Sequence, residues 1–266
     1  PDNARSLAVV RKVGVAFMQY APLGERGLAA GTRCAGFGAF FGEYRENTVR
    51  SLLSEGMPLA VHMPRIYTDA EQSEIERMLD VVRDCGVQTA CAMNVGQLPL
   101  LRRKGFTVHG GFGLNVCNGA ALDALAELGV VRQTLSFELR TAQLRDIDKP
   151  IQTEMVVYGH LPLMIFENCA IRRKTGKCSC KQGITTLTDR TGQRFALLPE
   201  FGCRNTLLNS RPLYLRAAYE RLGVQTARML FTTEPPEECA RIARAFLDGT
   251  PLDGDFTNGL YKRGVE

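Results

Sequence analysis

The chain has 266 residues, of which 45% are hydrophobic and 23% are charged, and its formal net charge at pH 7 is +5. These values are typical of a globular protein with one sizeable core or two smaller ones. No run of about 18 consecutive apolar residues occurs, so we expect no membrane-spanning helix.

The nine cysteines and the first residues bear on the cellular compartment. No charged-then-apolar leader opens the sequence, so we expect no signal peptide. An odd number of cysteines in a chain this long is not typical of a disulfide framework. We therefore expect a reducing, cytoplasmic location, in which the thiols are core residues, metal ligands or reactive groups. Because the sequence begins at Pro1 instead of Met, we leave open whether it is a piece of a longer protein.

The first 56 residues give mixed signals. Residues 7–17 combine β-branched residues with charges, and residues 27–44 are rich in glycine. Residues 46–56 are expected to form a helix that ends at Gly56.

From Pro58 onward, strand and helix patterns alternate. The expected extended segments are 58–64, 87–93, 106–116, 132–139 and 151–159, and the expected helices are 69–86, 96–105, 119–129 and 140–147. Connections this short favour parallel strands with crossover helices. We predict an α/β fold with a TIM-barrel-like parallel (β/α) core, and an open doubly wound sheet is the alternative. A barrel usually needs about 250 residues, so this core is either incomplete or completed by the first 56 residues.

The pattern changes after Gly159. Residues 160–216 lose the helical period and gain turns, and we expect an irregular, cysteine-rich segment there. A helix over 213–223, a strand over 224–231 and an amphipathic helix over 236–249 follow. We therefore divide the chain into a barrel-type core, residues 1–159, and a cysteine-rich segment with a C-terminal α/β extension, residues 160–266.

Four cysteines gather in this irregular segment: Cys169, Cys178, Cys180 and Cys203. Their spacing is C-x8-C-x-C-x22-C. Structural zinc sites usually use pairs about two to four residues apart, which fits this spacing poorly. An iron–sulfur cubane accepts thiolates from irregular spacings on a wrapping loop. The residues favour an iron–sulfur cluster over zinc, and zinc over unliganded thiols.

The same region carries the positive charge of the chain. Residues 167–216 contain ten Lys and Arg against three acids. Cations beside the cysteines would offset the negative charge of a thiolate-bound cluster and would lower thiol pKa values. Arg172, Arg173 and Arg204 are candidates to bind a phosphate or dicarboxylate substrate through bidentate contacts, and charge compensation of the cluster is the alternative.

Several phrases in a fixed order resemble peptidase family U32, the collagenase-like proteases. They include "EMVVYGHLPLMIFENCAI", "LTDRTGQRFAL" and "CRNTLLNSRPLYL", together with an S-x-E-L element at Ser136–Leu139 and a closing Gly-x-Tyr-x-Arg-Gly phrase at Gly259–Gly264. The resemblance extends from about Pro58 to the C-terminus. It implies a TIM-barrel-like core with a [4Fe–4S] cluster on the four cysteines named above.

The resemblance also implies a function. Better-understood relatives resemble oxygen-independent hydroxylases that modify a tRNA wobble uridine, a ribosomal RNA cytidine or the ubiquinone ring, with prephenate implicated as the hydroxyl source. We therefore expect an iron–sulfur enzyme that acts on RNA or on a small aromatic substrate, with prephenate as co-substrate. A homodimer or a heterodimer is left open.

Two alternative functions remain open. The first is a peptidase, as the family name states, although the sequence shows no Ser/His/Asp triad and no Cys/His pair in a recognisable context. The second is a non-catalytic RNA-binding module that uses the basic segment. That segment has few aromatic residues for base stacking, which counts against the second alternative.

The catalytic candidates fall in or directly after the expected strands, where barrel enzymes carry their chemistry. They are Glu138, Glu154 and His160. A carboxylate buried in a strand needs a partner, so each glutamate is either half of a structural ion pair or a group that faces a ligand. His62 and His109 are weaker candidates, because a histidine in a barrel strand is more often a satisfied core residue.

Overall fold

The computed structural model of the chain describes residues 16–19, 49–50, 53–54, 56, 58–177, 184–215 and 222–262, and for residues 16–19 it describes the backbone. The expected helix over 46–56 is helical at the four positions described between residues 49 and 54. The other patterns noted before Pro58 lie outside the described residues.

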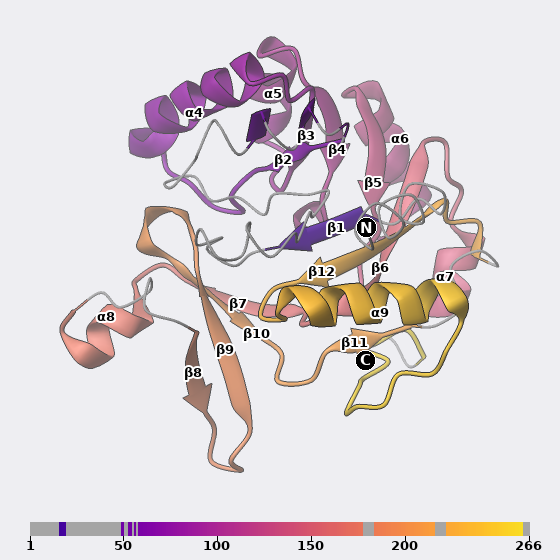
Figure 1. Cartoon of the computed structure of the whole chain (residues 1–266). Coiled ribbons are helices and arrows are strands. Elements are labelled where there is room, and N and C mark those ends of the chain that lie inside the picture. Colours follow the sequence, from indigo (N-terminus) through magenta and orange to yellow (C-terminus); the bar gives the residue numbers. More distant parts are fainter. Residues whose placement is uncertain are drawn as a thin grey trace.

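Parallel strands form the larger of two sheets, which curls into a half-barrel (Figure 1). Its order is β1-β12-β6-β5-β4-β3-β2, and β11 pairs with β6 off this path. The strands are β1 Ala16–Gln19, β2 Ala60–His62, β3 Thr89–Ala92, β4 Thr107–Gly110, β5 Val130–Thr134, β6 Gln152–Gly159, β11 Leu213–Tyr214 and β12 Thr226–Phe231. The parallel strands are joined by crossover helices, and these helices cover the sheet. Covered strands need short, mainly apolar sequences, which is what this part of the chain has. The predicted TIM-barrel-like core is confirmed.

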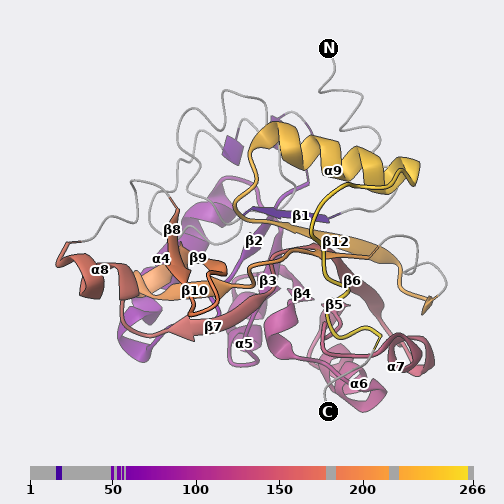
Figure 2. The same cartoon turned by 90° about the horizontal axis from the view of Figure 1, so that it is seen from below.

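Helices cover the outside of this half-barrel (Figures 1 and 2). They are α4 Gln72–Asp84, α5 Gln97–Arg103, α6 Gly119–Glu127, α7 Thr141–Asp146 and α9 Pro236–Asp248. The short helices η1 Asp69–Glu71 and η2 Phe112–Leu114 lie in the connections after β2 and β4. In α4 the buried residues are Ile75, Leu79 and Val82, which share one helical face. The predicted alternation of strands and helices from Pro58 to Gly159 is therefore confirmed in its order.

A second, four-stranded antiparallel sheet follows β6. Its order is β7-β10-β9-β8, with β7 Pro162–Phe166, β8 Thr185–Thr188, β9 Arg194–Pro199 and β10 Asn205–Leu208. Helix α8 Ala170–Thr175 follows β7, and the short helix η3 Phe201–Cys203 precedes β10. The prediction of an irregular segment missed this small sheet, because its strands have only four to six residues each and the turns between them dominate the local sequence pattern.

Three predicted elements were wrong in their bounds. The extended segment expected over 106–116 ends as β4 at Gly110, and Phe112–Leu114 form the short helix η2. The strand expected over 132–139 ends at Thr134, and residues 137–139 turn, with the Glu138 amide donating to the Ser136 hydroxyl at 3.2 Å.

The helix expected over 213–223 is replaced at its start by strand β11, which pairs antiparallel with the end of β6, and residues 216–221 lie outside the described residues. Tertiary pairing with a neighbouring strand overrode the local helical pattern there.

The chain returns to the barrel after the small sheet. Strand β12 pairs with both β6 and β1, and α9 packs on the barrel with Cys239, Ile242 and Phe246 in the core (Figure 2). The predicted division at residue 159 thus separates β6 from β12, which lie in one sheet. The division into two domains stays a prediction. None of the helices in the described ranges is long and apolar enough to cross a bilayer.

Candidate functional site

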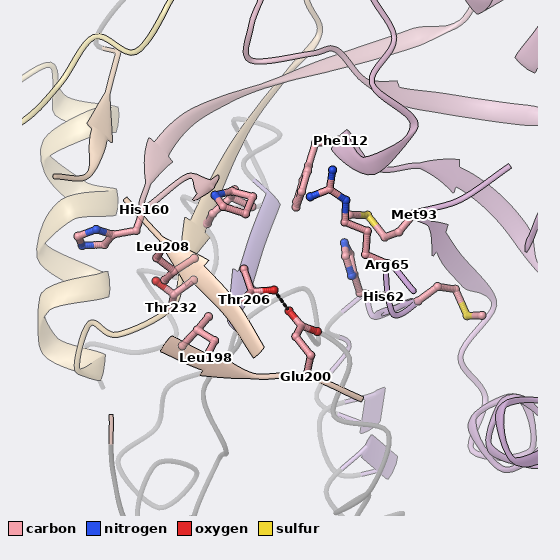
Figure 3. A pocket seen from close by; sticks show the side chains of 13 residues that line it. His62, Arg65, Met93, Phe112, His160, Leu198, Glu200, Thr206, Leu208 and Thr232 are labelled. Atoms are coloured by element: carbon pink, nitrogen blue, oxygen red, sulfur yellow. Dashed lines mark hydrogen bonds between the residues drawn. The ribbon is translucent and has the colours of Figure 1, made fainter. Parts of the chain in front are cut away.

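A pocket lies between the carboxyl ends of the barrel strands and the small sheet (Figure 3). Its volume is about 480 Å3, the open mouth included. The barrel side and its loops supply His62, Met63, Arg65, Met93, Phe112, His160, Leu230 and Thr232, and the small sheet with its loops supplies Pro162, Leu198, Glu200, Thr206 and Leu208. Active sites of barrel enzymes form at this end of the strands, so this is the candidate site.

Apolar side chains make up most of the wall. Met63, Met93, Leu198, Leu208 and Leu230 are all at most 3% exposed. The ring of Phe112, in η2 after β4, lies 6.4 Å from the ring of His62 and 5.8 Å from that of Phe137, centroid to centroid. An apolar wall with a few polar groups is the usual composition of a small-molecule pocket.

His62 stands at the end of β2 and is 4% exposed. Burial, with a further contribution from the Arg228 charge, lowers the pKa of its ring to about 3. The imidazole is therefore neutral at physiological pH, and His62 contributes a polar but uncharged surface to the pocket.

Glu200 brings a carboxyl group into the pocket from the opposite side (Figure 3). It follows β9, and the Thr206 hydroxyl on β10 donates a hydrogen bond of 2.8 Å to its Oε1. Burial raises the pKa of Glu200 to about 7, against the smaller opposing effects of the Thr206 hydrogen bond and the Arg65 charge. At neutral pH this carboxyl is thus close to equal parts acid and carboxylate.

Thr232, just after β12, is 2% exposed, and its hydroxyl makes no hydrogen bond within the described part of the chain. A buried hydroxyl normally has a hydrogen-bond partner. Because this one lines the pocket, a molecule in the pocket could supply that partner.

His160 is the only one of the three predicted catalytic residues that lines the pocket. It follows β6, and its Nδ1 lies 2.6 Å from the carbonyl oxygen of Asn209. Since a carbonyl oxygen can only accept, Nδ1 is the donor in this contact. Glu138, in contrast, is exposed in the turn after β5, away from the pocket lining.

Glu154 is fully buried in the barrel sheet and pairs with Arg228 of β12. Its Oε1 also accepts from the Thr134 hydroxyl, and its Oε2 makes no hydrogen bond with any described residue. Nearby, burial lowers the pKa of His109 to about 4 although the Glu154 charge opposes this effect. Of the two interpretations offered for Glu154, the geometry shows the buried ion pair.

Two of the four predicted cluster ligands lie at one end of the small sheet. In the antiparallel pair β7–β10, Asn205 is opposite Phe166, so Cys203 and Cys169 both continue from the same end. Cys169 caps α8, accepting a hydrogen bond of 3.4 Å from the Arg172 amide, and the Asn205 side chain accepts from the Ala170 amide at 2.8 Å. Cys178 and Cys180 lie outside the described residues.

The predicted anion-binding arginines do not line the pocket. Arg172 and Arg173 are exposed on α8. Arg204 is 4% exposed and forms ion pairs with Glu71 at 3.0 Å and with Glu167 at 2.8 Å. Arg204 thereby ties the start of β10 to the end of β7 and to the η1 turn of the barrel.

A five-residue loop, residues 200–204, joins the cysteine end of the small sheet to the pocket. The Glu200 amide donates to the Arg204 carbonyl at 2.7 Å, which closes the loop. Glu200 opens it and faces the pocket, Cys203 stands near its end in the left-handed region with φ 59°, and Arg204 anchors it. The sequence patterns did not identify Glu200 as a pocket residue, although its place three residues before a predicted ligand cysteine is a usable signal.

Comparisons with known proteins agree with the sequence motifs. Residues 25–187 match the model of peptidase family U32. A solved U32 peptidase structure, Mk0906, superposes with a TM-score of 0.51 at 11% identity, over 84% of this chain and 94% of that one. A putative copper homeostasis protein CutC from Streptococcus agalactiae gives a TM-score of 0.44 at 8% identity, over 81% and 98% of the two chains. No curated protein matches the sequence.

Proposed function

The chain belongs to peptidase family U32, and on this premise we propose that it is an iron–sulfur-dependent enzyme of the oxygen-independent hydroxylase type. Its substrate, an RNA base or a small aromatic molecule, would occupy the pocket between barrel and small sheet. The observation that carries the proposal is the loop 200–204, because one short segment holds both a predicted cluster ligand, Cys203, and a pocket carboxyl, Glu200.

The residues present fit a cluster. Cys169 and Cys203 approach one end of the small sheet from two strands, and neither thiol is fully buried. Cys178 and Cys180 would supply the other two thiolates, since they follow α8 in the sequence. Within the described residues no three His, Cys, Asp or Glu side chains assemble a metal site, so the ligand set of this proposal depends on those two cysteines. A bound cluster would supply one-electron transfer close to the pocket.

The protein's own side chains would bind and orient the substrate. Phe112 and Met93 offer flat and adaptable apolar contact to a ring. Arg65, exposed at the pocket, can attract a negatively charged group of the substrate or co-substrate. The buried leucines of the small sheet keep water away from one side of the ring, while Glu200 and Thr232 can hold its polar atoms.

Iron analysis tests the proposal. Protein purified without oxygen should be brown and contain about 4 Fe per chain. Cys203→Ser should lose most of the iron and of the visible absorbance. Cys117→Ser is the matched control, because Cys117 is also exposed but lies after η2, outside the cysteine segment. Colourless protein with stoichiometric zinc, or equal iron loss in both variants, would reject the proposal.

The family name and the Mk0906 structure favour a peptidase as the second candidate. A peptidase would use the pocket carboxyl and histidines in general acid–base catalysis of hydrolysis. It predicts cleavage of gelatin that survives Cys203→Ser and is lost in Glu200→Gln. Gelatin left intact by the wild-type protein would remove this candidate.

A further inference from the structure

We infer that Glu200 is the proton-exchanging side chain of the pocket, and that the pocket takes a small molecule with an apolar body and one oxygen or nitrogen lone pair facing Glu200. The inference deepens the proposed function, because it concerns the same pocket, but it does not depend on iron. It rests on how the carboxyl is held, on what surrounds it and on a second polar group in the pocket.

The position of Glu200 is fixed by one hydrogen bond to its side chain and one from its backbone amide. The Thr206 hydroxyl donates to Oε1 at 2.8 Å, and among the described residues no hydrogen bond to Oε2 occurs, so a ligand can pair with that oxygen. The loop is closed by the Glu200 amide and the Arg204 carbonyl, and Arg204 is held by Glu71 and Glu167. A group that exchanges protons needs such a fixed position relative to its partner.

The surroundings of Glu200 keep its protonated form available at neutral pH. Burial among apolar side chains raises the pKa of the carboxyl to about 7. The other titratable or charged groups that line the pocket are Arg65 and the histidines His62 and His160. His62 is neutral there, because burial lowers the pKa of its ring to about 3. Arg65 is exposed and opposes the effect of burial without cancelling it.

Thr232 independently indicates a ligand. Its buried hydroxyl has no hydrogen-bond partner among the described residues, and it lines the pocket with Glu200. In Figure 3 the Glu200 and Thr232 side chains both border the space next to Thr206 and Leu198. A ligand oxygen or nitrogen can accept from Glu200 while a second polar atom, or another lone pair, pairs with Thr232.

The chemical step is a proton transfer. The O–H bond of the Glu200 carboxyl breaks as the proton bonds to the lone pair of the ligand, and the carboxylate keeps the electron pair. The reverse transfer returns the proton to Glu200, so no further reactant is needed. A group whose pKa lies near the working pH serves equally as donor and acceptor.

The first experiment measures the protonation of Glu200 directly in wild-type protein freed of metal by a chelator. Dicyclohexylcarbodiimide reacts with protonated carboxyls, and peptide mass spectrometry locates the adduct. With its pKa raised to about 7, Glu200 should be labelled first at pH 7, and exposed Glu138 serves as the comparison residue. Labelling of Glu200 no faster than that of Glu138 would overturn the inference. Metal-free protein is used, so a failed iron analysis does not affect the result.

The second experiment measures ligand binding with cyclohexanone, an apolar ring with one acceptor oxygen, by nuclear magnetic resonance titration. Because the carboxyl must be protonated to donate, the affinity of the wild-type protein should fall about tenfold between pH 6 and pH 8. Glu200→Gln, which donates at both pH values, should lose this dependence, and Thr232→Val should bind about tenfold more weakly. Absent binding, or the same pH dependence in Glu200→Gln, would rule out the assigned ligand class.

Discussion

Two glutamates of this protein differ in their surroundings: Glu154 is fully buried in the barrel, Glu200 is half-buried in the pocket, and their carboxyl groups have different partners. Glu154 is matched by the guanidinium of Arg228 and by the Thr134 hydroxyl. Glu200 has a hydroxyl partner, Thr206, and a more remote cation, Arg65. A guanidinium partner stabilises a buried carboxylate, whereas burial without such a partner raises the pKa of Glu200 to about 7. On the inference above, Glu200 is the carboxyl that exchanges protons, and Glu154 is held in an ion pair.

The largest expected effect comes from breaking the Glu154–Arg228 ion pair in the barrel. Arg228→Met leaves a fully buried carboxylate without its cation, so we expect the free energy of unfolding to fall by about 3–5 kcal/mol at pH 7. Urea denaturation measures this loss. The double variant Glu154→Leu/Arg228→Met should regain most of it, because no unpaired charge remains. If Arg228→Met were as stable as the wild type, the Glu154–Arg228 ion pair would not stabilise the fold.

The Glu200→Gln variant tests the raised pKa of Glu200 through the pH dependence of the free energy of unfolding. The folded-state pKa of Glu200 is raised from 4.5 to about 7, so the folded state holds its proton more tightly than the unfolded state. The resulting stabilisation is fully present below about pH 4.5 and is lost as the pH rises through 7. Since Glu200 is partly exposed, we expect Glu200→Gln to gain about 2 kcal/mol relative to the wild type between pH 4.5 and pH 8. A pH-independent difference between the two proteins would contradict the raised pKa.

Gly202 tests whether the loop conformation holds Glu200 in place. Its φ is +68°, and an added Cβ would lie 2.3 Å from both Arg204 Nη1 and Glu71 Oε1. Gly202→Ala should therefore cost about 1–3 kcal/mol and lower the carbodiimide labelling of Glu200. Gly192→Ala is the matched control, since its φ is +86° and nothing lies within 4 Å of an added Cβ. An equal loss of unfolding free energy in the two variants would show that the Arg204 and Glu71 side chains can move aside without loss of stability.

The smallest expected effect concerns the hydrogen bond from the Thr206 hydroxyl to the Glu200 side chain. The Thr206 hydroxyl stabilises the carboxylate and so lowers the pKa of Glu200. Thr206→Val should move the pH midpoint of carbodiimide labelling upward by roughly half a pH unit. A midpoint that moves downward would mean that Thr206 favours the protonated form instead.

The catalytic predictions were made for the glutamates of barrel strands, and the structure places them differently. For Glu154 the sequence predicts either a structural ion pair or a group that faces a ligand, because a carboxylate in a strand is costly to bury alone, and the structure shows it paired with Arg228. Its partner lies on β12, 74 residues away, which no local pattern predicts. Glu138 was expected in a strand, but the strand ends at Thr134 and leaves this carboxyl in an exposed turn.

The sequence alone determined the family motifs, the order of strands and helices after Pro58 and the parallel core, because apolar periodicity and short connections depend on residues close together in the chain. Only the tertiary structure decided that a small antiparallel sheet faces the ends of the barrel strands and that Glu200 enters the pocket between them. Burial and pairing across that pocket depend on long-range contacts. The reactivity of this carboxyl is therefore a property of the fold and is invisible in its neighbours in the sequence.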